Sequence, residues 1–343
     1  MKENTKNGTP EMPELLTVSP SPHIKSHVTT RSIMADVLIA LLPAFIWGVY
    51  MSGVRALLIG AVSIVSCIVF EALCELVLRR PVTVSDLSAA VTGLIFAMNL
   101  PVSVPLWMPV VGAFFAIVVV KQLFGGIGKN FVNPALAARV FLFSAWAGQM
   151  TRFAAPGSPV SSLAFSLGEA DVVTGATPLA SLKAGVIPEA TLGDMFIGNI
   201  GGSIGEVSAV LLILGGIYLL FRRVITWHIP VTFIATVALL TYVFPKAGTS
   251  VDFMLYELMA GGLIFGAIFM ATDYVTSPIT STGKLIFGVG CGVLTVLIRY
   301  FGGYPEGVSF AILIMNLLVW YLDIIGMPKR FGAVGKTEKK PKM

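Results

Sequence analysis

A polar stretch, DVVTGATPLA, places an acid and two threonines around a Gly-Ala pair in an otherwise apolar chain. Thr177 stands directly before a proline, a pairing typical of a helix N-cap followed by the first helical residue. Backbone N–H groups at a helix start favour a phosphate group. Gly175 and Ala176 leave the threonine hydroxyl sterically open, and Asp171 offers a polar recognition group nearby. Two interpretations remain open: a plain helix start on a surface loop, or a site at which Thr177 carries a phosphorylated group.

Cysteine and histidine chemistry is not indicated. Cys67, Cys74 and Cys291 all lie in apolar runs, whereas an iron–sulfur cluster usually takes four thiolates at loop spacings. His23 and His27 are four residues apart and would share one face of a helix, but a metal site needs a third ligand and supporting partners. We therefore expect the cysteines to pack among apolar side chains, and we expect no metal site.

The composition is that of a membrane protein. Of the 343 residues 56% are hydrophobic and 12% are charged, and the mean hydropathy is +0.87. Soluble domains carry roughly 25% charged residues. Runs of 18 or more nearly uncharged residues recur, which is typical of membrane-spanning helices. The pattern predicts an all-α polytopic membrane protein, in which an excess of Lys and Arg indicates topology more than nucleic-acid binding.

We predict ten transmembrane helices from the apolar runs. The third is short and ends at the proline-rich sequence NLPVSVP. The predicted helices cover residues 33–52, 55–78, 85–100, 106–124, 133–150, 198–221, 227–244, 255–273, 283–302 and 307–324.

The positive charges predict the direction of these spans. With the N-terminus in the cytoplasm, 17 Lys and Arg residues fall on the cytoplasmic side and 5 on the opposite side. Cytoplasmic loops of membrane proteins typically carry an excess of Lys and Arg. We therefore expect a protein of the cell (inner) membrane with both termini in the cytoplasm. The long loop that contains DVVTGATPLA is then extracytoplasmic. The five Lys and Arg residues predicted on the extracytoplasmic side are Arg55, Arg152, Lys183, Lys246 and Arg299.

Short sequence matches indicate an internal repeat. GLIF at 93–96 recurs at 262–265, FGG at 124–126 recurs at 301–303, and SIMADV near the first span resembles SIGEV near the sixth. The offsets are all close to 170 residues. A repeat of five spans must insert upside down in its second copy, which is the inverted-repeat plan of many transporters.

These observations divide the chain into five parts. The basic ends could contact anionic lipid or soluble partners. The predicted parts are a cytoplasmic leader (1–30), a first five-helix repeat (31–150), an extracytoplasmic loop (151–197), a second five-helix repeat (198–325) and a basic cytoplasmic tail (326–343).

Acidic residues within or beside the spans are candidates for an ion path. Asp36 and Glu206 begin the two repeats, so inversion would place them near opposite faces, and Asp273 marks a loop junction. The alternative is placement at headgroup level or pairing with an arginine. The further acids of this kind are Glu71, Glu75, Glu257 and Glu306.

The polar stretch and several longer segments resemble a known protein family. DVVTGAT resembles the sequence on which bacterial flavin transferases act, Asp-x-x-(Ser/Thr)-Gly-Ala-Thr. The surrounding chain, over about residues 21–325, is similar to the RnfD family of membrane proteins from Rnf complexes, which are ion-translocating ferredoxin:NAD oxidoreductases. It is more distantly similar to the NqrB membrane protein of the sodium-translocating NADH:quinone reductase. The resemblance is carried by SPHIKS (21–26), FGGIGKNFVNPALAARVFLF (124–143), GNIGGSIGEVSAVLLILGG (198–216), ATDYVTSP (271–278) and IRYFGGYPEGVSFAILIMN (298–316).

The resemblance implies a fold and a covalent cofactor. The family fold is ten helices in two inverted halves, similar to urea transporters. Thr177 would carry FMN as a phosphoester, so that a one-electron carrier on an exposed loop cannot diffuse away. The other residues of the flavinylation motif would be Asp171, Thr174, Gly175 and Ala176.

The family also binds riboflavin non-covalently within its helices. The sequence FGGIGKNFVNPALAAR offers Asn130, Asn133 and Arg139 as hydrogen-bonding groups at membrane depth. We hypothesise that these three residues hold the second flavin. Helix packing with a proline-ended loop is the alternative explanation of the same residues.

The implied role is that of a membrane electron-relay protein. It would work in a complex that couples electron transfer between ferredoxin and NAD to translocation of Na⁺ or H⁺. The implied partners are the other membrane and iron–sulfur subunits, a flavin transferase for maturation, and membrane lipid. We expect no independent enzyme activity. A urea-transporter-like solute channel without a redox role is the alternative, and a channel has no use for a flavinylation motif.

Overall fold

The computed structural model describes residues 28–154, 175, 177–206 and 208–327. Every regular element in these ranges is a helix, so the predicted all-α class is confirmed for this part of the chain. Among the predicted site residues, Asp171, Thr174 and Ala176 lie outside the described residues, as do most of the predicted leader and the tail from 328.

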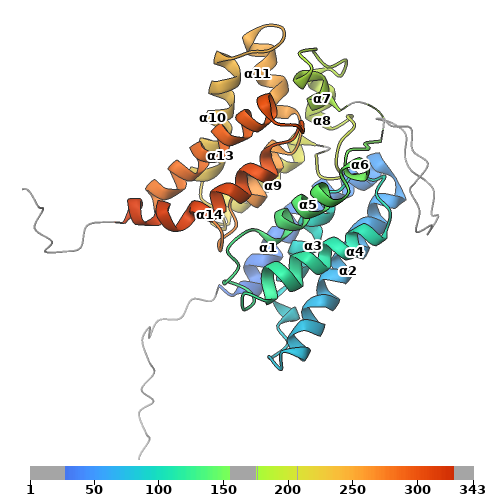
Figure 1. Ribbon diagram of the computed structural model, residues 1–343, viewed down its shortest axis with the longest axis vertical. Helices are drawn as coiled ribbons and strands as arrows, with labels where there is room; N and C mark the ends of the chain where they lie inside the picture. The colour runs from blue at the N-terminus through green and yellow to red at the C-terminus, as the bar shows by residue number, and fades with distance from the viewer. Residues whose placement is uncertain (1–27, 155–174, 176, 207, 328–343) are drawn as a thin grey trace, which may run out of the picture.

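The N-terminal helices form one group, drawn in blue to green in Figure 1. A capping box between Thr29 and Ser32 begins the first helix, and the second packs against the third and fourth. The elements are α1 (Thr30–Ser52), α2 (Val54–Val77), the 3₁₀ turn η1 (Val84–Asp86), α3 (Ser88–Met98), α4 (Trp107–Phe114), its π-helical continuation η2 (Phe115–Gln122), α5 (Pro134–Ala145) and α6 (Ala147–Met150).

The C-terminal helices form a second group, yellow-green to red in Figure 1. Within it α13 packs along both α10 and α14. The elements are α7 (Pro178–Lys183), α8 (Leu192–Ile197), α9 (Ala209–Phe221), α10 (His228–Val243), α11 (Ser250–Met259), α12 (Leu263–Phe265), its π-helical continuation η3 (Gly266–Met270), α13 (Ser281–Phe301) and α14 (Val308–Gly326).

The length and hydropathy of the helices fit a protein that crosses a membrane several times. Four helices of the described part, α1, α2, α13 and α14, are long and apolar enough to span it, and α11 with Leu263–Met270 makes a fifth if this pair, bent by 62°, is counted as one span. Five shorter apolar helices accompany them: Ser88–Met98, Trp107–Gln122, Pro134–Ala145, Ala209–Phe221 and His228–Val243.

The predicted helix boundaries agree with the structure where helices are continuous. The first, second, seventh, ninth and tenth predicted spans match α1, α2, α10, α13 and α14 within three residues at each end. Four other predicted spans are wrong in continuity, and the third is one of them, because Leu87 separates η1 from α3. The fifth is interrupted at Trp146, the sixth is helical only from Ala209, and the eighth breaks between Met259 and Leu263. Apolar composition does not reveal such breaks, because the residues around them are almost all uncharged.

The two helix groups join through irregular backbone near the middle of the molecule. The backbone N–H of Gly205 donates to the Met98 carbonyl (2.7 Å), and that of Ile204 donates to the Leu100 carbonyl (3.1 Å). The last carbonyl groups of a helix have no partner within the helix, and these bonds supply partners at and just after the end of α3. A Cβ at position 205 would lie 2.8 Å from the Met98 backbone oxygen, so this close approach requires glycine.

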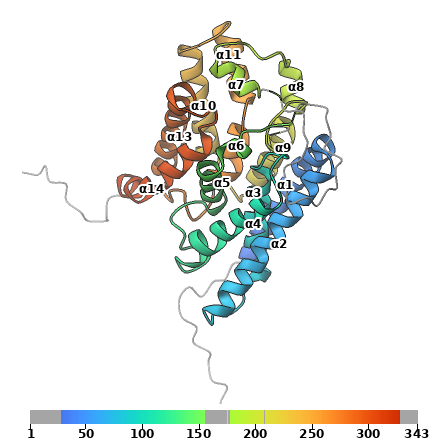
Figure 2. The ribbon, with the colours of Figure 1, turned by 45° about the vertical axis from the view of Figure 1, so that its right-hand side comes forward.

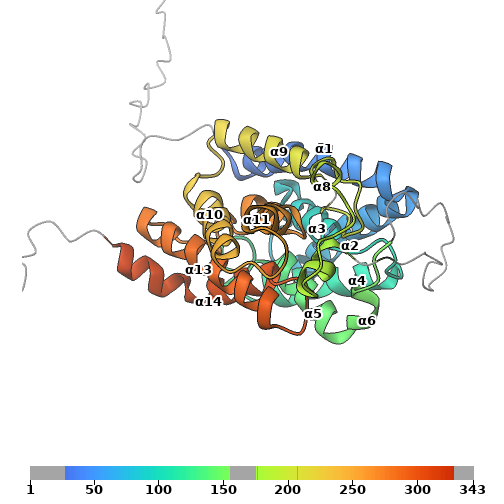
Figure 3. The same cartoon turned by 90° about the horizontal axis from the view of Figure 1, so that it is seen from above.

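Two further contacts hold the groups together. Helix α9 lies alongside α1, as Figure 3 shows from above. Helix α5 contacts both α3 and α14 and thus lies between the two groups (Figure 2). The residues that α5 contributes therefore face both halves of the protein.

Candidate functional site

Thr177 is the N-cap of α7, as the sequence predicted. Its backbone is extended (φ −73°, ψ 151°), its Oγ1 accepts a hydrogen bond from the Ala180 N–H (3.3 Å), and Pro178 is the first helical residue. The Thr177 side chain is partly exposed and Gly175 is exposed. The hydroxyl is therefore fixed by local helix geometry while one side of it stays accessible.

A small cavity, with an empty volume of about 340 Å³, lies beside Thr177. It is also lined by Glu206, from the segment before α9, and by Glu306, from the turn between α13 and α14. The predicted cofactor-bearing threonine and the predicted ion-path acid Glu206 thus share one cavity. Sequence reasoning named Glu306 among the further candidate acids, but it did not predict that this residue joins the other two.

Arg139 links the two acids from the buried side. It extends from α5 and is 5% exposed. Its Nη1 donates to Glu306 Oε1 (2.7 Å), Asn99 Oδ1 (2.8 Å) and Ser309 Oγ (3.0 Å). Its Nη2 donates to Glu306 Oε2 and lies 3.6 Å from Glu206 Oε1. One guanidinium therefore faces two carboxylates.

The two carboxylates differ in how well they are satisfied. The side chains of Glu206 and Glu306 are 8% and 13% exposed. Glu306 receives hydrogen bonds from Arg139 at both oxygens. Glu206 Oε2 accepts a long bond from the Ser203 N–H (3.4 Å), but Glu206 Oε1 and Ser203 Oγ are buried without a hydrogen-bond partner. Buried oxygens of this kind are rare in proteins and call for an explanation.

A second buried arginine lies at the end of α11, beside the break in the eighth span. Arg299, on α13, pairs with Glu257 Oε2 at 2.6 Å, and the two side chains are 2% and 3% exposed. Arg299 also donates to the backbone carbonyls of Glu257 (2.7 Å) and Ala260 (3.0 Å). It thereby satisfies carbonyl groups at the end of α11. The sequence did not predict this pair.

A larger pocket, with an empty volume of about 820 Å³, lies between α1, α3, η2 and η3. Its walls are mainly apolar, and its polar lining includes Asn130, Asn133 and Asp273. Arg139 is not part of it. The three residues hypothesised to hold a second flavin are therefore divided between two places: Asn130 and Asn133 at the large pocket, and Arg139 at the acids beside Thr177.

The two asparagines also have structural roles at this pocket. Asn133 Oδ1 accepts from the backbone N–H groups that begin α5, and its Nδ2 donates to the Met270 carbonyl (3.2 Å). Asn130 Nδ2 donates to the Val132 carbonyl (3.1 Å). These bonds fit the alternative of helix packing with a proline-ended loop, and they leave Asn133 little capacity for a ligand.

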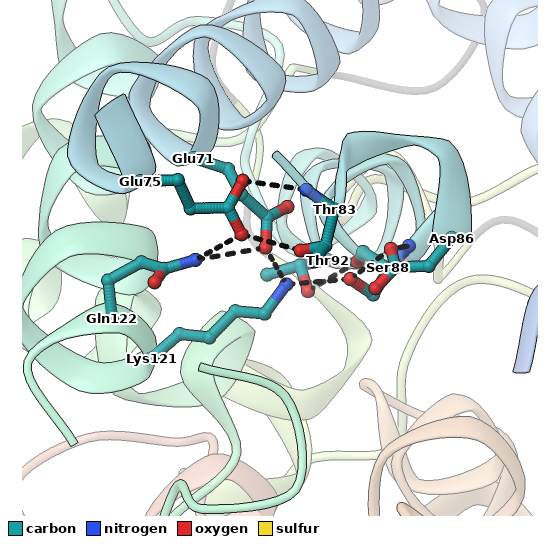
Figure 4. Close-up of polar contacts among 8 residues, drawn as sticks. All are labelled: Glu71, Glu75, Thr83, Asp86, Ser88, Thr92, Lys121 and Gln122. Atoms are coloured by element: carbon teal, nitrogen blue, oxygen red, sulfur yellow. Dashed lines mark hydrogen bonds and ion pairs between the residues drawn. The ribbon is translucent and has the colours of Figure 1, made fainter. Parts of the chain in front are cut away.

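Lys121, from η2, contributes a cation to the same pocket and is fixed by the network in Figure 4. Its Nζ donates to Glu71 Oε1 (2.5 Å) and Ser88 Oγ (2.7 Å). Gln122 donates to the same Glu71 oxygen (3.1 Å). Glu75 accepts from the backbone N–H and the hydroxyl of Thr83 and, at 3.5 Å, from Gln122 Nε2. The network was not predicted, although two of its acids were named as candidates.

The remaining predicted ion-path acids lie apart from one another. Asp36 joins α1 to α9: it accepts from Tyr218 (3.0 Å) and pairs with Arg222 (3.1 Å). Asp273 accepts from the Thr276 hydroxyl (2.9 Å) and lines the large pocket. For Asp36 the structure fits the alternative of pairing with an arginine, and Glu206 is the predicted ion-path acid that lies beside Thr177.

Comparison with known proteins places this geometry in context. Residues 17–332 match the model of the NQR2, RnfD, RnfE family. The chain is 44% identical over 331 residues to the D component of the Na(+)-translocating ferredoxin:NAD(+) oxidoreductase complex of Acetobacterium woodii, covering 95% of this chain and 98% of that protein. It is 41% identical over 330 residues to the D component of the proton-translocating ferredoxin:NAD(+) oxidoreductase complex of Clostridium ljungdahlii, covering 93% and 96%. A third relative is the D component of the ion-translocating oxidoreductase complex of Stutzerimonas stutzeri, with 40% identity over 88% of this chain and 91% of that protein.

Proposed function

Since the chain belongs to the NQR2, RnfD, RnfE family, we propose that it is a membrane electron-relay component of an ion-translocating ferredoxin:NAD oxidoreductase complex. The names of its relatives support this role, because they include both Na⁺- and proton-translocating complexes. The chain would act with the other membrane and iron–sulfur subunits of such a complex, in contact with membrane lipid, and would not be an enzyme by itself.

Thr177 is proposed to carry FMN as a phosphoester. The observation that carries this proposal is the position of its hydroxyl, which belongs to the flavinylation motif and lies at an accessible helix start. An ester at Oγ1 keeps a lone pair for the Ala180 N–H, so the modification does not require the N-cap to be lost. FMN, when bound, supplies one-electron chemistry, while the residues of this chain hold its phosphoryl end. Attachment would require a flavin transferase.

The large pocket between α1, α3 and η3 is proposed to hold the non-covalent riboflavin. Apolar walls with a few polar groups are typical of cofactor sites, and both features are present here. Asn130 and Asp273 would form part of the polar rim, whereas Asn133 would only line the pocket because its amide is used by α5 and Met270. Arg139 is left out of this proposal, because its guanidinium lies outside the pocket and binds Glu306 and Asn99.

The ten-span inverted-repeat arrangement is also proposed, with both termini in the cytoplasm. Four long apolar helices, the bent pair and five shorter apolar helices supply ten segments. A helix of 13 residues such as α9 is only about 20 Å long, less than the roughly 30 Å of a bilayer core. Short helices continued by irregular backbone are typical of transporter spans near a binding site, which fits the segment before α9.

Flavin fluorescence of the denatured protein tests the central part of this proposal. A band purified from the native host should fluoresce under ultraviolet light after denaturation, and Thr177→Ala should abolish the signal. Thr191→Ala is the matched control, because Thr191 is also an N-cap threonine of this loop, at the start of α8. A dark wild-type band would contradict the relay and favour the solute channel.

A further inference from the structure

We propose that Glu206 and Glu306 form a binding site for one monovalent cation, either a proton or Na⁺, beside the break in the eighth span. This inference deepens the proposed function and rests on it in one respect only, namely that the bound ion is the translocated one. The binding site itself follows from charge, burial and geometry around Arg139.

The charge count at this site is unbalanced. Two largely buried carboxylates face one guanidinium, because Glu306 pairs with Arg139 and Glu206 Oε1 lies 3.6 Å from the same Nη2. Burying an uncompensated charge in a low-dielectric interior is strongly unfavourable. One added monovalent cation makes the group neutral: a proton would bind one carboxylate oxygen, and Na⁺ would be held between oxygens.

Neighbouring charges do not remove the imbalance. Arg299, on α13, approaches the helix break but pairs with Glu257 at 2.6 Å. Lys183, on α7, donates to the Gly302 carbonyl (2.5 Å). Among the side chains whose contacts are described around this site, the guanidinium of Arg139 is the cation that both Glu206 and Glu306 share.

Oxygen atoms without donors point to where the cation would bind. Glu206 Oε1 and Ser203 Oγ are both buried and both lack a hydrogen-bond partner. Carboxylate and hydroxyl oxygens are ligands for hard cations, and a carboxylate oxygen is equally a proton acceptor. The same chemistry therefore serves Na⁺ and H⁺.

Gly262 shows that the two carboxylates converge. A Cβ built on this residue would lie 3.1 Å from Glu306 Oε1 and 3.3 Å from Glu206 Oε1. Two oxygens from segments about a hundred residues apart thus approach one point, directly before α12. Interrupted membrane helices commonly provide ion sites at such breaks.

The same break contacts the helix that begins at Thr177. A Cβ on Gly261 would lie 3.0 Å from Leu179 Cδ2, so α7 packs directly on the backbone of the break. Thr177 and the two carboxylates also line one cavity. A movement of α7 would therefore shift the backbone beside the cation site, and this contact is a physical route by which the two could be coupled.

Infrared difference spectroscopy of the purified native complex tests the site without relying on its activity. In Na⁺-free buffer the pH is lowered stepwise, and at constant pH NaCl is added against an equal concentration of choline chloride. A proton site predicts a protonated-carboxyl band that grows as the pH falls and is insensitive to Na⁺. A Na⁺ site predicts a change in the carboxylate bands on adding NaCl but not choline chloride.

The variants identify the group that gives the signal. Glu206→Gln should abolish it, whereas Glu257→Gln should retain it, because Glu257 is a buried carboxylate already balanced by one arginine. Gly262→Ala should weaken the signal and serves as the decisive variant if Glu206→Gln does not assemble. Gly303→Ala is its control, because a Cβ there meets no atom within 4 Å.

Absence of both cation-dependent signals in the wild-type complex would overturn the proposal, as would signals of equal size in Glu206→Gln. The outcome is separate from that of flavin attachment. A complex that lacks flavin on Thr177 but still binds the cation would contradict the electron-relay role and support the cation site. A complex that carries the flavin but gives no cation-dependent signal would contradict the cation site alone.

Discussion

Two buried arginines lie near the break between α11 and α12, and they differ in the groups that they bind. Arg299 has one carboxylate, Glu257, and two backbone carbonyls at the end of α11. Arg139 has two carboxylates, Glu206 and Glu306. The first arrangement is neutral and satisfies a helix end, so its role is structural. The second carries one excess negative charge and is suited to exchange a cation.

The networks beside the two cavities differ in a similar way. Beside the large pocket, Lys121, Gln122 and Thr83 supply donors to Glu71 and Glu75, as Figure 4 shows. Each of Glu71 and Glu206 has one buried oxygen without a hydrogen-bond partner. The two acids differ at the other oxygen, because Glu71 Oε1 accepts bonds of 2.5 and 3.1 Å, whereas Glu206 Oε2 accepts a single bond of 3.4 Å.

Removal of Arg139 should give the largest effect. Arg139→Ala would leave two carboxylates buried without a cation, and loss of one partner from a buried ion pair costs about 3–5 kcal/mol. We expect little assembled complex, and a clearly lowered melting temperature for what assembles. Size-exclusion chromatography and thermal unfolding of the purified complex measure this. A melting temperature equal to that of wild type would show that the two acids are already neutral.

Glu257→Gln should be next, and it distinguishes the balanced pair from the unbalanced group. The substitution leaves the Arg299 charge buried with only carbonyl and amide oxygens, at an expected cost of about 3 kcal/mol. Glu206→Gln removes an excess charge and should stay within about 1 kcal/mol of wild type. Parallel thermal unfolding of the two variants measures the difference. Equal destabilisation would mean that Glu206 is as tightly paired as Glu257.

Gly262→Ala should have an intermediate effect that is confined to the cation site. Gly262 has a negative φ of −76°, so alanine causes no backbone strain there. Its methyl group would instead press on both carboxylates, at 3.1 and 3.3 Å. We expect a drop in ion transport by the reconstituted complex with near-normal assembly, and Gly303→Ala should transport normally. Normal transport by Gly262→Ala would argue against convergence of the two oxygens.

Asp194→Asn should give the smallest effect and tests a local feature of the loop. Hydrogen bonds from Thr191 lower the pKa of Asp194 below its ordinary value. A lowered folded-state pKa means that this carboxylate stabilises the start of α8 at neutral pH and stops doing so as the pH falls through that lowered pKa. Hydrogen exchange of residues 192–197 should be faster in the variant at neutral pH. Exchange equal to wild type would show that the capping box does not limit opening of α8.

The sequence predicted features that depend on neighbours along the chain. The N-cap at Thr177 and the boundaries of α1, α2, α10, α13 and α14 follow from local pattern, and the structure confirms them. Each depends on residues within a few turns of one another. Hydropathy and capping chemistry were therefore sufficient.

Features that depend on distant neighbours were not predictable. Arg139 and Glu306 are 167 residues apart in the chain, and the sequence does not show that they meet. The breaks in the sixth and eighth spans were also missed, because Gly205 and Gly262 look like ordinary glycines of apolar runs. The close Met98 carbonyl requires glycine at position 205, and at the break in the eighth span it is the neighbouring Gly261, with a positive φ of 68°, whose backbone favours glycine.

Mass mapping of the peptide around Thr177 from the native complex tests the central claim most directly. The account predicts that this peptide carries the mass of one FMN, and that fragmentation places the group on Thr177 rather than on Thr174. A native complex in which the peptide that contains residues 171–183 has its unmodified mass would contradict the account.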